Sequence, residues 1–273
     1  GDLLIEQVKA SAKLYGIPLQ ILSTTECNDR YPPFSIPDNY DIVLEPEAGF
    51  LDVGKAITNY ASAAVKHGAE IKTGEKVMEW KQVGDHTEVH TDKGIYHCRK
   101  LVITAGPWSA DLVPGIKDKL KITRQVLSWL QPAEVDAFTM DKFPCWMIVK
   151  PGKPGSYYGF PAMNPGEVAG PAGIKLALHH PGQATTAKTI DRSIQPDDLD
   201  HLLSFAKEYL PSAGTTITDT ATCMYSNSPD EHFIIDHLPG TDKQVTVAWG
   251  FSGHGFKFVS VVGEVLADLV VDG

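Results

Sequence analysis

The sequence predicts a mixed α/β (α+β) protein that contains two kinds of region. Helical periodicity, short buried strands and glycine-ended turns alternate through residues 50–126 and 230–273. Residues 127–229 instead show aromatic-rich alternation, which is typical of an antiparallel sheet with one covered face. With 42% hydrophobic residues, the chain of 273 residues can bury a sizeable core. We therefore expect the domain organisation to change near residue 127 and again near residue 230.

Charge and cysteine spacing limit the possible partners. A formal net charge of −10 argues against a nucleic-acid partner, because phosphate contacts need a basic surface. No apolar run reaches membrane-spanning length, so we expect no membrane partner. The four cysteines are far apart and form no Cys-x-x-Cys pair, which favours reduced thiols over disulfides or a zinc site. These features predict a cytoplasmic protein without a bound metal.

Helical and extended segments alternate through residues 1–104. Apolar residues at spacings of three and four predict helices over residues 3–14 and 53–67, and Gly68 ends the second helix. The many prolines, threonines and aspartates of residues 17–39 predict a loop with short helical turns. The strands expected in this half are residues 40–44, 69–77, 87–90, 94–98 and 100–104, with 87–90 and 94–98 forming a hairpin.

Short alternating segments predict an antiparallel sheet in the next part of the chain. These segments begin at Val126 and continue through the run Tyr157-Tyr-Gly-Phe-Pro to a strand that starts at Gly173. A period of two places Lys175 and His179 on one face of that strand, with His180 on the other, so a zinc site at the paired histidines is not expected. An aspartate-rich start and an apolar stripe predict a helix over residues 196–210.

The C-terminal stretch concentrates the most unusual residue choices. Residues 233–235 and 245–249 are predicted to be neighbouring strands. A loop with Gly250, Gly253 and Gly255 follows the second strand and leads into an apolar helix over residues 258–270. Amide groups at a helix start have no partner within the helix and carry partial positive charge, so this strand, loop and helix start form a candidate anion site.

Four motifs together resemble one known family. The stretch that begins Cys223-Met-Tyr, followed by Ser252-Gly-His-Gly-Phe-Lys-Phe, resembles the C-terminal signature of the monomeric sarcosine oxidase and N-methyltryptophan oxidase family. Members of that family are covalent flavoenzymes that oxidise secondary amines. Tyr157-Tyr-Gly-Phe-Pro and Lys175-x-x-x-His are similar to family motifs in the same order, and so is the strand and turn that begins at Leu101.

The resemblance implies an FAD-dependent oxidoreductase fold. Residues 1–49 and 127–229 would form the substrate domain, and residues 50–126 and 230–273 part of the FAD-binding domain. The fingerprint Gly-x-Gly-x-x-Gly, which binds the pyrophosphate after a first strand, is not found in the sequence. We therefore expect an N-terminally truncated, incomplete form of the fold.

The resemblance also implies roles for individual residues. Cys223 would carry FAD through a thioether, Lys175 would help O2 to react, His179 would orient the substrate, and Tyr158 would line the substrate cavity. Lys257 would pair with the substrate carboxylate. The remaining implied cofactor-binding residues are Met224, Tyr225, Gly253, His254, Gly255 and Phe256, together with Lys257 itself.

The implied reaction is oxidation of sarcosine or another N-methyl amino acid with O2, which gives an imine, then an aldehyde and an amine, with hydrogen peroxide. One alternative is a truncated, non-catalytic binding module, and another is a related amine dehydrogenase or pipecolate-type oxidase. Each residue also has an ordinary interpretation: Cys223 as a small residue buried in a turn, Tyr158 as a cross-strand aromatic, His254 as part of a turn. The common order of the four motifs favours the family.

Overall fold

The computed structural model describes residues 3–271 except 153, 164, 165, 167, 169 and 181. It divides into two compact units. Unit 1 comprises Gly1–Lys55, Val126–His180 and Arg192–Thr222, and unit 2 comprises Ala56–Gln125, Pro181–Asp191 and Cys223–Gly273. The assignment of substrate and FAD domains to the two parts of the chain remains a prediction.

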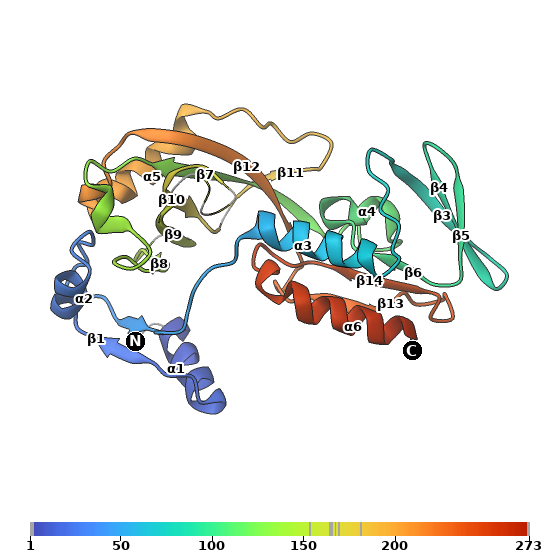
Figure 1. Cartoon of the computed structure of the whole chain (residues 1–273), viewed down its shortest axis with the longest axis horizontal. Coiled ribbons are helices and arrows are strands. Elements are labelled where there is room, and N and C mark those ends of the chain that lie inside the picture. The colour runs from blue at the N-terminus through green and yellow to red at the C-terminus, as the bar shows by residue number, and fades with distance from the viewer. Residues whose placement is uncertain are drawn as a thin grey trace. The chain divides into compact units, whose positions relative to one another are not determined.

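A six-stranded sheet contains the aromatic-rich part of the chain (Figure 1). The strand order is β11-β7-β10-β9-β8, and β12 also pairs with β7. The pairs β7–β10, β9–β10, β8–β9 and β7–β11 are all antiparallel, which confirms the predicted sheet. Its strands are β7 (Lys121–Leu130), β8 (Trp146–Val149), β9 (Ser156–Met163), β10 (Gly173–Leu178), β11 (Gln183–Thr185) and β12 (Ile217–Asn227).

Helix α5 (Pro196–Tyr209) packs into the core of unit 1. Its start is fixed by a capping box in which the Gln195 amide donates to the Asp198 carboxylate at 2.8 Å. Leu202 and Phe205 are buried with Ile174 of β10, because alternation along the strand sends every second side chain to the helix side. The predicted helix is confirmed to within one residue.

The first 44 residues contain more regular structure than the sequence predicted. Helix α1 (Leu3–Tyr15) and strand β2 (Ile42–Leu44) were expected. Residues 17–39 were expected to be a loop with short helical turns; the short helix α2 (Thr24–Arg30) agrees with this, whereas β1 (Gln20–Leu22), which pairs with β2, was not predicted. A Ser23–Glu26 capping box starts α2, and this Ser-x-x-Glu signal outweighs the turn-forming composition around it.

Unit 2 contains two three-stranded sheets, ordered β3-β4-β5 and β13-β14-β6 (Figure 1). The expected strand over residues 69–77 is wrong, since β3 begins only at Val77. The 87–90/94–98 hairpin and the 233–235/245–249 pair are confirmed. The strands are β3 (Val77–Val83), β4 (His86–Thr91), β5 (Ile95–Cys98), β6 (Leu101–Ile103), β13 (Ile234–His237) and β14 (Val245–Trp249).

The helices of unit 2 differ in how deeply they are buried. Helix α3 (Val53–Lys66), which starts in unit 1, was predicted, but it buries none of its residues. Helix α6 (Val259–Val271) follows the short turn η4 (Phe256–Phe258) and buries Leu266.

The other short helices of the described residues, from both units, are η1 (Gly106–Trp108), α4 (Ser109–Leu112), η2 (Val135–Phe138) and η3 (Pro211–Ala213).

A second core lies within unit 2. Val245, Val247 and Trp249 of β14 pack there with Ile103 of β6. Trp108 of η1 is 45% exposed. Among the described residues, no helix combines the length and the apolar character needed to cross a bilayer.

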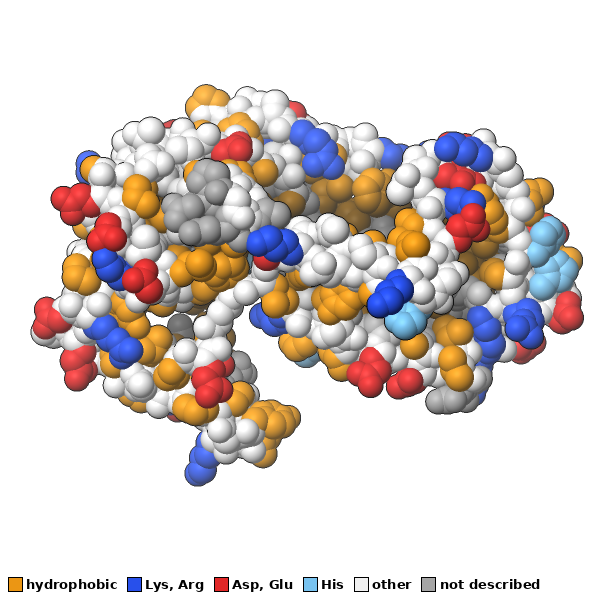
Figure 2. All heavy atoms as spheres, in the orientation of Figure 1, with side chains coloured by type: hydrophobic (Ala, Val, Ile, Leu, Met, Phe, Trp, Pro, Cys, Tyr) orange, Lys and Arg blue, Asp and Glu red, His pale blue; other side chains and the backbone are white. Residues whose placement is uncertain are grey.

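On the face shown in Figure 2, acidic and basic side chains are interspersed rather than gathered by sign. The net charge of −10 is therefore not concentrated in one acidic area of this face.

Candidate active site

Lys175 lies on β10 of unit 1, between two aromatic residues at directly opposed positions. Its Cα partners are Trp129 on β7 and Phe160 on β9. The Lys175 Nζ atom lies 4.9 Å from the centre of the Phe160 ring, 5.6 Å from that of Tyr158 and 5.9 Å from that of Trp129. Three aromatic faces therefore surround one half-buried ammonium group, an arrangement that attracts a cation to the rings.

An irregularity in β9 produces this arrangement. Ile174 pairs with Ala162, whereas the next residue, Lys175, pairs with Phe160, so Pro161 has no partner on β10. Proline cannot donate to a strand partner, and bulges are positions where it is tolerated. Without the extra residue, Lys175 would oppose Pro161 instead of an aromatic ring.

Tyr158 and His179 join the same cluster. Their rings lie 6.2 Å apart in an edge-to-face arrangement, and the His179 amide donates to the Ser156 carbonyl at 2.7 Å. Lys175, Tyr158 and His179 are thus brought together within unit 1, although their catalytic roles remain predictions. Tyr157 points to the other side of β9, where its ring stacks on Phe205 at 3.9 Å.

His180 differs from the prediction. Its ring lies 4.4 Å from the ring of His179, so the two side chains do not occupy opposite faces. The reason is that β10 ends at Leu178, after which strand alternation no longer governs the direction of the side chains.

A cavity of about 1200 Å³ in unit 1 borders this cluster at Phe50, whose ring stacks on that of Phe160 with the centres 5.5 Å apart. It is lined by residues of the first 50 positions together with residues 140–151 and Pro161. Lys175, Tyr158 and His179 do not line it. Cavity volume alone would therefore not have identified these three predicted residues.

The second group of predicted residues lies in unit 2, at the end of a parallel strand pair. β6 and β14 are parallel, with Val245 opposite Leu101 and Val247 opposite Ile103. Their carboxyl ends consequently meet at one edge of the sheet, where open α/β sheets bind ligands. Both strands run into glycine turns there, with φ of 51° at Gly106 and 74° at Gly250.

The loop after β14 is fastened to the end of β12. The Ser252 amide donates to the Ser226 carbonyl at 3.0 Å, and Asn227 forms an isolated bridge with Phe251. Gly253 has φ of 78°, and a Cβ atom at this position would lie 2.3 Å from the Tyr225 ring. Only glycine fits such a contact, so Tyr225 and Gly253 are packed directly together.

The other predicted residues of unit 2 surround this contact. Cys223 lies within β12 rather than in a turn, and it is half-buried. Strand alternation places Cys223 on the same face as Tyr225, while Met224 packs against the core of unit 2. The His254 ring lies 4.9 Å from that of Phe233.

Gly255 and the residues after it complete the loop. A Cβ atom at Gly255 would lie 2.6 Å from the Phe251 side chain. Phe256 and Lys257 form the short turn that precedes α6, and the Lys257 side chain is exposed, with its Nζ 5.9 Å from the centre of the Phe258 ring.

A family model described as FAD dependent oxidoreductase matches residues 2–269. The chain belongs to the FAD dependent oxidoreductase family. This membership confirms the predicted fold, the FAD cofactor and the expectation that the protein is an enzyme.

Sequence relatives specify the group within this family. A monomeric sarcosine oxidase of Bacillus sp. (strain NS-129) is 33% identical over 277 residues, which cover 100% of this chain and 69% of that protein. A monomeric sarcosine oxidase of Streptomyces avermitilis is 35% identical, covering 96% of this chain and 67% of that protein. An N-methyl-L-tryptophan oxidase of Yersinia pestis (strain Pestoides F) is 36% identical, covering 96% and 68%. The predicted resemblance is confirmed.

Solved structures share the fold of this oxidoreductase. NikD, described as an unusual amino acid oxidase, superposes with a TM-score of 0.81 at 22% identity, covering 97% of this chain and 68% of that chain. L-proline dehydrogenase from P. horikoshii has a TM-score of 0.80 at 21% identity, covering 100% and 70%. At identities this low, the likeness shows a shared fold and carries no information about the substrate.

The residues of unit 2 fit an FAD cofactor. The half-buried thiol of Cys223 shares a strand face with Tyr225, whose ring packs on the glycine loop. The exposed ammonium group of Lys257 follows that loop and adds positive charge beside a helix start. A glycine turn at a helix start and a neighbouring cation are chemically compatible with the negatively charged groups of FAD.

Sequence reasoning missed two members of the unit 1 cluster. Trp129 and Phe160 were not among the predicted site residues. A period of two along β9 places Phe160 on the same face as Tyr158, so this residue could have been found from alternation. Trp129 could not, because its opposition to Lys175 depends on the pairing of two distant strands.

Proposed function

We propose that this oxidoreductase oxidises a secondary amine, sarcosine or another N-methyl amino acid, with O2. The products are an imine, which water hydrolyses to an aldehyde and an amine, and hydrogen peroxide. The amine gives up two electrons and two protons, and O2 takes up both. Identities of 33–36% to named sarcosine and N-methyl-L-tryptophan oxidases support the substrate class. Bound FAD supplies the two-electron acceptor that links the two halves of this reaction.

The proposed reaction with O2 rests on the position of the Lys175 ammonium group. O2 gains negative charge as it accepts electrons, and a fixed positive charge nearby lowers the free energy of that state. Contacts with Trp129, Tyr158 and Phe160 hold this charge in one place, within 6 Å of all three ring centres. A fixed cation needs no reorganisation at the moment of reaction.

Tyr158 and His179 are proposed to contact the substrate. They lie edge to face on the Lys175 side of the sheet, opposite the face that packs on α5. An aromatic wall excludes water, and an imidazole beside it can hold an amine in a fixed orientation.

Cys223, Met224, Tyr225 and the loop from Gly253 to Lys257 are proposed to hold FAD. Cys223 would form a thioether to the flavin, because its thiol is half-buried on the face shared with Tyr225. Gly253, His254, Gly255 and Phe256 would approach the cofactor through backbone and ring contacts. The exposed ammonium group of Lys257 would bind the substrate carboxylate.

No disulfide joins the four cysteines of the described part of the chain. We propose that the enzyme works in the cytoplasm, where cysteines are kept reduced.

The test loads the protein with FAD and mixes it anaerobically with sarcosine, N-methyl-L-tryptophan or pipecolate, while the visible flavin absorbance is recorded. Air is then admitted and hydrogen peroxide is measured. We expect an N-methyl amino acid to bleach the flavin and each turnover to release one peroxide. Bleaching without peroxide would indicate an amine dehydrogenase, and faster bleaching by pipecolate would indicate a cyclic substrate. A protein that takes up no flavin would support the binding-module alternative.

A further inference from the structure

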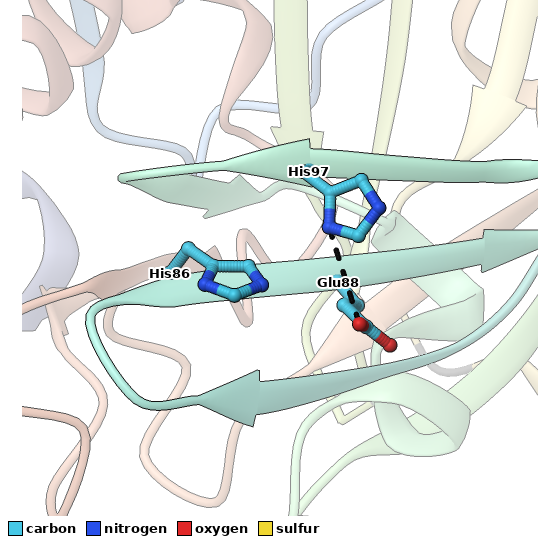
Figure 3. A group of neighbouring side chains, drawn as sticks. All are labelled: His86, Glu88 and His97. Carbon is cyan, nitrogen blue, oxygen red and sulfur yellow. Dashed lines mark ion pairs between the residues drawn. The ribbon is translucent and has the colours of Figure 1, made fainter.

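Two histidines and a glutamate share one face of the β3-β4-β5 sheet in unit 2 (Figure 3). His86 and Glu88 are two residues apart on β4, so their side chains project from the same face. His97 on β5 is the Cα partner of Glu88. The register of the hairpin therefore brings three side chains with metal-binding atoms to adjacent positions.

The three side chains are close enough to share one ion. One ligand atom from each lies within 4.8 Å of the other two. The His97 Nδ1 atom lies 4.0 Å from a Glu88 carboxylate oxygen, and the rings of His86 and His97 lie 5.4 Å apart. In a tetrahedral zinc site the ligand atoms are roughly 3.4 Å apart, so small side-chain rotations complete the approach.

The Glu88 carboxylate is hydrogen-bonded to a neighbouring histidine. His90, two residues further along β4, lies with its Nε2 atom 3.0 Å from the second carboxylate oxygen of Glu88. This hydrogen bond fixes the orientation of the Glu88 carboxylate and leaves its other oxygen on the side of His97. A hydrogen bond to the remaining oxygen of a ligating carboxylate is a usual feature of metal sites.

Lys81, the cation that could compete with a metal ion for Glu88, forms an ion pair with a different residue. Lys81 is the Cα partner of Glu88 on β3, but its Nζ atom pairs with Glu79 at 2.9 Å. The Asp85 carboxylate lies 3.3 Å from the His86 Nδ1 atom, which leaves Nε2 of that ring as the ligand atom facing the cluster. The surroundings of the three side chains are thus compatible with added positive charge.

We propose that His86, Glu88 and His97 bind one divalent transition-metal ion, with Zn²⁺ as the preferred ion. Two imidazole nitrogens and one carboxylate oxygen form a donor set that Zn²⁺ accepts, and water fills the fourth position. The ion would join β4 to β5. Histidine side chains gather over this part of the surface in Figure 2, and His97 is 60% exposed, so an ion can enter from solvent.

The test treats the protein with a chelator, removes the chelator, and titrates ZnCl₂ by isothermal calorimetry. Wild type is compared with His86→Gln, Glu88→Gln and His97→Gln, and with His67→Gln as a matched control, since His67 is an exposed histidine of the same unit outside the cluster. We expect one Zn²⁺ per chain with a Kd of about 1 µM or below in wild type and the control. Each cluster variant should weaken binding at least about tenfold.

A second measurement separates a lost site from a damaged fold. Circular dichroism should be the same for all the variants without metal, because His97 is exposed and the side chains of His86 and Glu88 are only partly buried. Zn²⁺ should raise the melting temperature of wild type and His67→Gln but not of His97→Gln. The proposal fails if wild type binds no zinc at about 100 µM, or if His97→Gln and His67→Gln bind it equally well.

Discussion

Lys175 and Phe160 occupy directly opposed positions on β10 and β9, and the Lys175 Nζ atom lies 4.9 Å from the centre of the Phe160 ring. The opposition exists because Pro161 is an extra residue in β9. The aromatic ring therefore fixes the position of the charge that we propose to act on O2.

Replacing this ring should slow the reaction with O2. Phe160→Leu removes a cation–π contact worth ~1–2 kcal/mol, which corresponds to about 5- to 30-fold in the second-order rate of flavin reoxidation. Lys175→Met should cost more, about 100-fold or greater, because the charge itself is lost. Stopped-flow mixing of substrate-bleached enzyme with O2 measures both rates. Tyr157→Phe is the matched control, since Tyr157 stacks on Phe205 across the sheet; an equal effect of this control would contradict the assignment.

Cys223→Ser should abolish covalent flavin attachment. Serine keeps the size of the side chain but cannot form a thioether, so the visible absorbance should leave the pellet after acid precipitation. Cys98→Ser is the control, because burial raises the pKa of the Cys98 thiol and makes it a poor nucleophile. Retention of colour in the Cys223→Ser pellet would show that another residue carries the flavin.

Gly253→Ala should destabilise the loop more than its matched control, Gly240→Ala. Both glycines have similar backbone angles, with φ of 78° and 80°, so both substitutions carry a comparable strain of ~1 kcal/mol. Only at Gly253 would the new Cβ atom meet a ring, 2.3 Å from Tyr225, whereas nothing lies within 4 Å at Gly240. We expect ~1–3 kcal/mol of additional loss for Gly253→Ala in urea unfolding. Equal losses would mean that Tyr225 moves aside without cost.

Tyr209→Phe should change how stability depends on alkaline pH. Burial, followed by a hydrogen bond with Tyr40 whose oxygen lies 2.7 Å away, raises the pKa of Tyr209. The phenol therefore contributes stability that is complete below the unfolded-state pKa of about 10 and is lost as pH rises from there through the folded pKa.

At about pH 8 the variant should lose ~1 kcal/mol with the hydrogen bond. Between about pH 8 and about pH 11 it should lose less of its unfolding free energy than wild type does, because it cannot ionise. Urea unfolding at both pH values measures this difference, with Tyr60→Phe on the exposed side of α3 as the control. A loss identical to that of wild type would contradict the argument.

Local pattern was sufficient to predict most of the fold. The helix over residues 196–210, the hairpin near Glu88 and the strand pair that ends at Trp249 were all predicted, because each follows from the periodicity of neighbouring residues. The strand expected over residues 69–77 failed for the converse reason, since extended propensity does not provide a pairing partner and β3 finds one only from Val77 onward.

The family, the FAD cofactor and the candidate residues could be predicted from the sequence, because those depend on residue identity and order. Which side chains meet could not be predicted in this way. Phe160 opposes Lys175 through a bulge, and Glu88 meets His97 through hairpin register. Both contacts depend on strand pairing, where a shift of one residue reverses every side chain, and no local spacing specifies that register. The rings of His179 and His180 approach each other for a different reason, because β10 has ended at Leu178.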